Sequence, residues 1–127
     1  MKNTEQKILK HLQERGWDNL RPGDLAKSIS IEASELLENF QWDNPTQEEL
    51  KKNKVKLESV KSELADVLIY CFEFSILFGF DTEKIILKKL TQVNKKYPAK
   101  LMRNRKGEAG TEDVYWKIKN EYRKNSK

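Results

Sequence analysis

Two short acidic motifs hold the side chains of this sequence that are best suited to catalysis. Glu32 and Glu35 form one i, i+3 pair, and Glu63 and Asp66 form a second. Carboxylates gathered in a partly buried site repel one another, so they need a cation to stay ionised. Oxygen-only ligands suit Mg²⁺, or Mn²⁺ in its place, and Mg²⁺ characteristically shares its coordination shell with water and phosphate. These residue types therefore predict metal-assisted phosphoryl transfer to water.

Both acid pairs lie at the border of an apolar helix face. The apolar arc beside the first pair consists of Leu25, Ala26, Ile29, Ala33, Leu36, Leu37 and Phe40. The stripe beside the second pair consists of Leu57, Val60, Leu64, Val67, Leu68, Cys71 and Phe78. If the two helices pack antiparallel with their acidic borders together, the four carboxylates converge. Such pairs also occur as ordinary solvated charges, and the pattern alone leaves both interpretations open.

Helical patterns extend along the remaining chain, and no alternating strand pattern of useful length occurs. Capping and breaking residues predict helices from Thr4 to Gly16, Pro22 to about Phe40, Thr46 to Phe78 with a break near Asn53, Asp81 to about Lys96, and a short last helix from Glu112. The last five residues, 123–127, are expected to fray. We therefore expect an all-α bundle of about four to five helices, with the active site between the two central ones.

Composition predicts one domain, spanning residues 1–127, with a thin core. Hydrophobic residues make up 37% of the chain and charged residues 35%, so some apolar faces should close against another subunit. Cys71, the only cysteine, excludes an intrachain disulfide, and we expect it to be buried. Its apolar run is too short, and with Glu73 too charged, to span a membrane. A cytoplasmic location is the expectation.

A basic region offers the main alternative function. The net charge is +5, and no Asp or Glu occurs from Lys84 to Gly107. Such a region attracts polyanions. A helical nucleic-acid-binding or adaptor protein would explain this charge, but it would not explain the paired acids, so nucleic acid is the less favoured partner.

The residues around the acids resemble a known family. Residues 32–42 read EASELLENFQW, and residues 63–70 read ELADVLIY. Together they resemble the MazG-like, all-α NTP pyrophosphatase superfamily, and within it most closely the dCTP pyrophosphatase type. The resemblance extends from about Trp17 to Leu101. In that family the four acids bind the metals, so the resemblance implies this role for Glu32, Glu35, Glu63 and Asp66.

The resemblance also implies a reaction and an assembly. It implies Mg²⁺-dependent hydrolysis of a nucleoside triphosphate, usually a deoxynucleotide, to the monophosphate and pyrophosphate, as in house-cleaning of the dNTP pool. It further implies a homodimer or homotetramer, with the active site completed near a subunit interface. Glu38 is often an extra motif acid in relatives, but its outward position on the helix here leaves a direct metal role open.

Candidate substrate contacts complete the predicted site. They are Trp17, Trp42, Tyr70, Lys89, Asn94, Lys96 and Tyr97. The two tryptophans resemble aromatic positions that line the family's nucleotide pocket, and Tyr70 lies on the acidic border of its helix. Lys89 and Lys96 are suited to phosphate. Asn94 lies one residue closer to Tyr97 than in relatives, which leaves its role open, and packing or a solvated basic face remains the alternative for the others.

Overall fold

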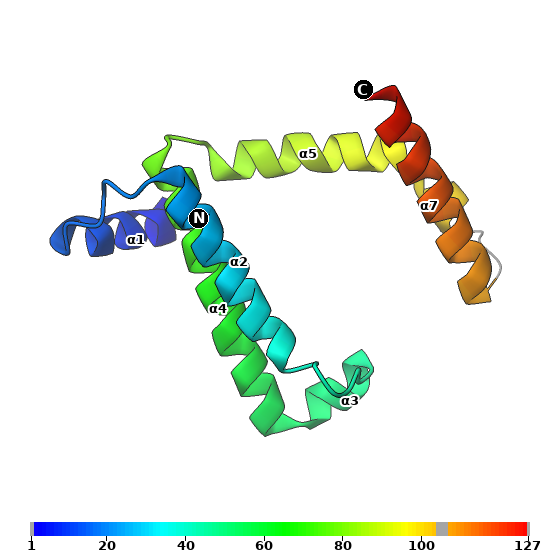
Figure 1. Ribbon diagram of the computed structural model, residues 1–127, viewed down its shortest axis with the longest axis horizontal. Coiled ribbons are helices and arrows are strands. Elements are labelled where there is room, and N and C mark those ends of the chain that lie inside the picture. Colours follow the sequence, from blue (N-terminus) through cyan, green and yellow to red (C-terminus); the bar gives the residue numbers. More distant parts are fainter. Residues whose placement is uncertain (1, 104–106, 127) are drawn as a thin grey trace. The chain divides into compact units, whose positions relative to one another are not determined.

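The computed structural model describes residues 2–103 and 107–126, and all regular structure in these residues is helical. The helices are α1 (Lys2–Glu14), α2 (Pro22–Glu38), α3 (Gln47–Lys52), α4 (Lys54–Leu77), α5 (Thr82–Lys96), α6 (Ala99–Arg103) and α7 (Gly107–Asn125) (Figure 1). The predicted all-α class is confirmed. None of the described helices combines the length and apolar character needed to cross a membrane.

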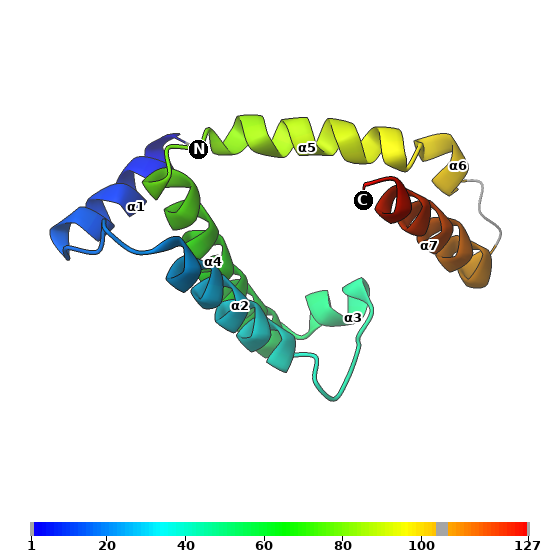
Figure 2. The same cartoon turned by 45° about the horizontal axis from the view of Figure 1, so that its top comes forward.

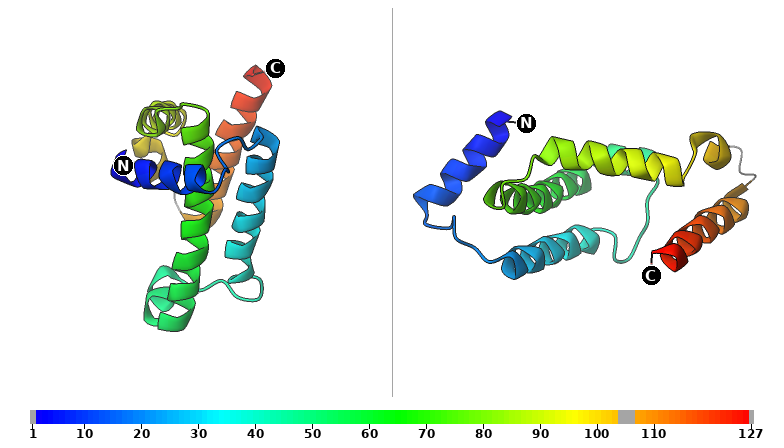
Figure 3. Two further views of the ribbon diagram at one scale, coloured as in Figure 1. Left: turned by 90° about the vertical axis from the view of Figure 1, so that its left-hand side faces the viewer. Right: turned by 90° about the horizontal axis from the view of Figure 1, so that it is seen from above.

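The chain packs as two compact units, one ending at Thr82 and the other starting at Glu83. In the first unit, α2 and α4 lie side by side and antiparallel (Figure 1, Figure 2 and Figure 3). Helix α1 packs against α4, and α3 lies in the connection that leads into α4. Leu12 of α1 and Leu25 of α2 are the fully buried apolar side chains among the described residues. The second unit contains α6 and α7 in contact, together with α5 after its first residue.

Local signals set most helix ends as predicted. Pro22 opens α2, where its missing N–H costs nothing. Thr46 and Glu49 form the capping box of α3: the Thr46 hydroxyl accepts from the Glu49 N–H, and the Glu49 carboxylate accepts from the Thr46 N–H. At Asn53 the chain breaks between α3 and α4, and the Asn53 side chain caps α4. Gly79 follows α4 with a φ of 68°, a left-handed conformation that favours glycine.

Three predicted boundaries were wrong. Thr4 lies inside α1 and does not cap it, because Thr costs little within a helix and does not by itself set a start. Helix α7 begins at Gly107, well before Glu112, and continues to Asn125, so most of the segment expected to fray is helical. Glycines near its start lower helix stability by only about 1 kcal/mol each, which the longer helix offsets. Helix α6 was not anticipated.

The predicted apolar stripe of α4 is only partly covered in the single chain. Leu64 is 44% exposed, Leu68 is 47% exposed and Cys71 is exposed, so the prediction of a buried Cys71 was wrong. Helix α2 packs against α4, and these three exposed residues, spaced i, i+4 and i+7, share one face of α4. Leu37 of α2 is also exposed, at 65%.

Glu73 is the unexpected buried residue of α4, at 6% exposure. Burial raises the pKa of its carboxyl group, because the charged form loses hydration. The folded-state pKa thus exceeds the unfolded-state pKa, so ionisation of Glu73 lowers the free energy of unfolding. This destabilisation is absent at low pH, where the carboxyl group is protonated in both states. It becomes complete once the pH rises above the folded-state pKa.

Replacing Glu73 with Gln should therefore stabilise the protein at pH 8 and have little effect near pH 4.5. We expect the melting temperature at pH 8 to rise by a few degrees, the shift that about 1 kcal/mol produces in a chain of this size. Thermal unfolding followed by circular dichroism across this pH range would measure it. Glu58→Gln, at an exposed position of the same helix, is the control and should show no such pH trend. A gain that is equal at all pH values would contradict the burial argument.

Candidate metal centre

Three carboxylates from two helices converge where α2 packs on α4. Glu32 of α2 and Glu63 and Asp66 of α4 each offer one oxygen, and these oxygens lie within 4.8 Å of one another. All three side chains are half-buried. The antiparallel packing predicted from the acidic borders is thus present, and it brings together three of the four predicted acids as a potential ligand set.

Glu35, the fourth predicted acid, lies next to this cluster. The negative charge of Glu35 contributes to the raised pKa of both Glu32 and Glu63, so its carboxyl group lies close to both. Its side chain is exposed, unlike those of the other three acids. Glu35 therefore forms the solvent-facing side of the site.

Glu38 lies nearer to the cluster than its helical position suggested. Its negative charge contributes to the raised pKa of Glu63, although it is the smallest of the causes. The side chain itself is exposed and does not belong to the convergent set. Glu38 thus adds negative potential to the site without supplying one of the clustered oxygens.

The cluster is electrostatically frustrated. Burial, followed by Glu35 and by the charges of Asp66 and Glu63, raises the pKa of Glu32. Burial, followed by the charges of Glu35 and Asp66, raises the pKa of Glu63. Both shifts reflect the cost of holding several negative charges together with little water. A bound cation would remove that cost.

The donor set fits a divalent cation. Oε2 of Glu63 is buried and has no hydrogen-bond partner among the described residues, which is costly for a carboxylate oxygen. Oxygen-only ligands at this spacing are those that Mg²⁺ or Mn²⁺ prefers. An ion there would satisfy the Glu63 oxygen and offset the mutual repulsion of the acids.

Tyr70 lies beside the cluster, as predicted. Burial and then the negative charges of Glu73, Glu32 and Asp66 raise the pKa of its phenol, while a hydrogen bond with Ser28 acts in the opposite direction. Ser28 of α2 thus lies near Tyr70 of α4, at the level of the acids. Ser28 was not predicted as a site residue. Its position one helical turn before Glu32 was the signal that could have identified it.

The two candidate tryptophans lie on loops of the first unit. Trp17 packs edge-on against His11, with ring centroids 6.0 Å apart, and is 50% exposed. Trp42 is 90% exposed. The loop after α2 is nonetheless anchored, because Lys56 of α4 pairs with Asp43 and lies over the Phe40 ring. Among the described residues, no polar or ring contact joins either tryptophan to the acids.

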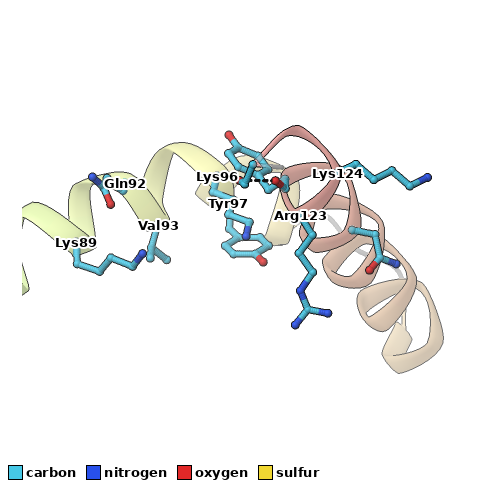
Figure 4. Close-up of a pocket in the computed structure, with 10 residues that line it drawn as sticks. Lys89, Gln92, Val93, Lys96, Tyr97, Arg123 and Lys124 are labelled. Carbon is cyan, nitrogen blue, oxygen red and sulfur yellow. Dashed lines mark hydrogen bonds between the residues drawn. The ribbon is translucent and has the colours of Figure 1, made fainter.

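The remaining candidates belong to the second unit. Lys89, Lys96 and Tyr97 line a pocket between α5 and α7 (Figure 4). Asn94 is exposed on α5 and is not among the lining residues. The structure thus groups three of the four candidates from this segment in one place.

Comparison with known proteins decides the family. The MazG-like family matches residues 27–110, a stretch that contains all four predicted acids. The chain belongs to the MazG-like family. A pyrophosphatase from Archaeoglobus fulgidus of known crystal structure is similar to this MazG-like chain, with 33% sequence identity and a TM-score of 0.68. The similarity covers 77% of this chain and 92% of the other. A search of curated proteins gave no match.

Proposed function

We propose that this MazG-like chain is a metal-dependent nucleoside triphosphate pyrophosphohydrolase. The observation that carries the proposal is the convergence of Glu32, Glu63 and Asp66, with Glu35 beside them, at the α2–α4 contact. The products would be a nucleoside monophosphate and pyrophosphate. Family membership and the likeness to a pyrophosphatase support this reaction class.

Each residue of the site has a proposed task. Glu32, Glu63 and Asp66 would hold a divalent cation, which we propose to be Mg²⁺, with Mn²⁺ as a substitute. When bound, such an ion neutralises phosphate oxygens and lowers the pKa of a coordinated water. Glu35, exposed and within reach of two of these acids, is placed to orient a water and to accept its proton at a carboxylate oxygen. Tyr70, near Ser28, would form one wall of the site.

The nucleoside end of the substrate requires aromatic surface. Trp42 is the most exposed aromatic side chain of the first unit, on a loop that the Asp43–Lys56 pair anchors. Stacking of a base on such a ring contributes on the order of 1–3 kcal/mol and tolerates different bases. We propose deoxynucleotides as substrates, with a role in dNTP pool house-cleaning and dCTP as the first to test.

A direct test is pyrophosphate release from a panel of canonical and modified dNTPs. Activity should require Mg²⁺ or Mn²⁺ and should stop on addition of EDTA. The rival function, nucleic-acid binding, predicts instead an affinity for DNA or RNA that falls steeply with salt and does not depend on the acids. Absence of pyrophosphate release with every nucleotide and both metals would remove the hydrolase proposal.

We further propose that the active form is a homodimer or homotetramer. Leu64, Leu68 and Cys71 form an exposed apolar face on α4, and α5 exposes Ile86 at 53% and Leu90 at 50%. Exposed apolar side chains in such number are typical of subunit interfaces. A second copy of the chain would cover them.

The oligomer can be tested by light scattering coupled to gel filtration. The measured mass should be twice or four times the chain mass of 15.0 kDa. Leu68→Glu should shift the mass toward that of the monomer, since it would place a charge in the interface, whereas Lys61→Glu, at an exposed charged position of the same helix, should not. A monomeric wild-type chain at micromolar concentration would contradict the proposal.

A further inference from the structure

Lys56 of α4 contacts the chain on both sides of Trp42. Its ammonium group forms an ion pair with the Asp43 carboxylate and lies 5.3 Å from the centre of the Phe40 ring. Lys56 is itself held in place, because its side chain is only 19% exposed and its backbone N–H donates to the side chain of Asn53. One half-buried cation thus fixes a residue before Trp42 and the residue after it.

Packing of the Trp42 ring does not explain this arrangement. The ring is 90% exposed, so it adds little to the core of the first unit. The segment that follows has stabilising contacts of its own, because Thr46 and Glu49 cap α3 and Asn53 caps α4. An ion pair whose carboxylate is 60% exposed contributes little to the stability of the whole chain. The contacts of Lys56 therefore act mainly on the loop that carries Trp42.

This loop lies on the side of α4 that carries the acids. Residues 56 and 63 are seven apart, which is close to two full helical turns, so Lys56 and Glu63 share a face of α4. The helical rise separates them by about 10 Å along the axis. A nucleoside extends over a similar length from its phosphate. An indole held near this level is therefore placed to meet the base of a nucleotide whose phosphates lie at the acids.

We propose that Lys56 is a positioning residue for the nucleoside, which holds Trp42 so that its ring is ready to stack on the base. Stacking on a ring that is already ordered costs less conformational entropy than stacking on a mobile one. The Lys56 ammonium is engaged by Asp43 and by the Phe40 ring, so it acts through Trp42 and not as a phosphate ligand. The inference rests on the proposed hydrolase function and adds a residue that sets substrate affinity without taking part in the chemical step.

The first test compares the steady-state kinetics of variants with the best substrate of the nucleotide panel. Lys56→Met keeps the apolar stem and removes the cation, so it should raise KM about fivefold and leave kcat within about twofold. Lys56→Arg keeps both the charge and the ring contact and should restore the wild-type KM. Lys61→Met is the matched control: it removes a cation that pairs with Glu58 on the same helix, and it should change neither constant.

A double variant shows whether Lys56 acts through the indole. Trp42→Ala should itself raise KM by about tenfold, since stacking on the base is lost. Adding Lys56→Met to Trp42→Ala should then change KM by less than about twofold, because the ring that Lys56 positions is already gone. If the two effects multiply instead, Lys56 acts by another route and the proposal is overturned.

Fluorine NMR gives a measurement that needs no turnover. In protein labelled with fluorotryptophan, the Trp42 resonance is identified by its loss in Trp42→Phe. Lys56→Met should narrow this resonance and move it toward the position of the free amino acid, because the loop becomes mobile, whereas Lys61→Met should not. A nucleotide analogue that cannot be cleaved between the α and β phosphates, added with MgCl₂, should shift the Trp42 resonance. Its Kd should be about fivefold higher in Lys56→Met than in the wild type.

The two measurements separate this inference from the hydrolase function. Binding of the analogue at Trp42 without pyrophosphate release from any nucleotide would remove the hydrolase function and keep the role of Lys56. Hydrolysis with the same KM in Lys56→Met as in the wild type would keep the hydrolase function and overturn the role of Lys56. An unchanged Trp42 resonance in Lys56→Met, or an analogue that leaves this resonance unshifted in the wild type, would overturn it as well.

Discussion

Replacing Asp66 with Asn should lower kcat for pyrophosphate release by about a thousandfold. Asp66 offers one of the three converging oxygens, and an amide in its place removes both a negative charge and a strong ligand. Metal ions contribute several kcal/mol of transition-state stabilisation, and each 1.4 kcal/mol is a factor of ten in rate. Steady-state assays with dCTP and Mg²⁺, coupled to pyrophosphate detection, would measure the change. Glu63→Gln should have a similar effect.

A matched control distinguishes a loss of kcat caused by removing a site residue from a general effect of removing an acid. Glu58→Gln removes an acid from the same helix, at an exposed position where it pairs with Lys61, and should leave kcat within about twofold. The inactive variants should also be at least as stable as wild type in EDTA, because they relieve repulsion among the acids. If Asp66→Asn retained a tenth of wild-type activity, the assignment of this cluster as the catalytic centre would be wrong.

Divalent cations should stabilise the folded protein through the same acids. A ligand that binds only the native state contributes about 2.7 kcal/mol at a concentration of one hundred times its Kd, which amounts to a rise of many degrees in melting temperature. Thermal unfolding with and without MgCl₂ should therefore show a large shift that EDTA reverses. The shift should be lost in Glu63→Gln and kept in Glu58→Gln. This measurement does not depend on any substrate.

The size of the metal shift should depend on pH. The pKa values of Glu32 and Glu63 are raised above their ordinary value of 4.5, so the metal-free folded state binds protons more tightly than the unfolded state does. Protons therefore compete with the cation as the pH falls through this raised range. The shift should be largest near pH 8 and should shrink toward pH 5. A shift that is independent of pH, or equal in Glu63→Gln, would show that the ion binds elsewhere.

Local chemistry explains which features the sequence could predict. The capping box at Thr46, the break at Asn53 and the opening of α2 at Pro22 depend on neighbours within a few residues. The i, i+3 spacing of the acids likewise depends only on helix geometry, so it correctly placed Glu32, Glu63 and Asp66 on facing borders. Features of this kind need no knowledge of the rest of the chain.

Burial on α4 was not predictable in the same way. The apolar pattern identified a stripe but not how much of it a neighbour would cover, so Leu64, Leu68 and Cys71 were expected inside and are exposed in the single chain. The same geometry buries Glu73, which a hydrophobicity pattern places at the surface. Which side of a helix is covered depends on the partners that pack there, and those come from distant parts of the sequence or from another subunit.

The sequence by itself determined the helical class, most helix boundaries and which acids lie on facing helix borders, because each follows from residue type and from spacing along one helix. Only the tertiary structure decided that Glu63 carries a buried oxygen without a hydrogen-bond partner among the described residues, that Ser28 lies near Tyr70, and that cations of α5 and α7 line one pocket. Those features depend on which helices pack together and on how the helices are aligned along each other. Contacts between residues far apart in the chain determine both the pairing and the alignment, and no local sequence pattern encodes these contacts.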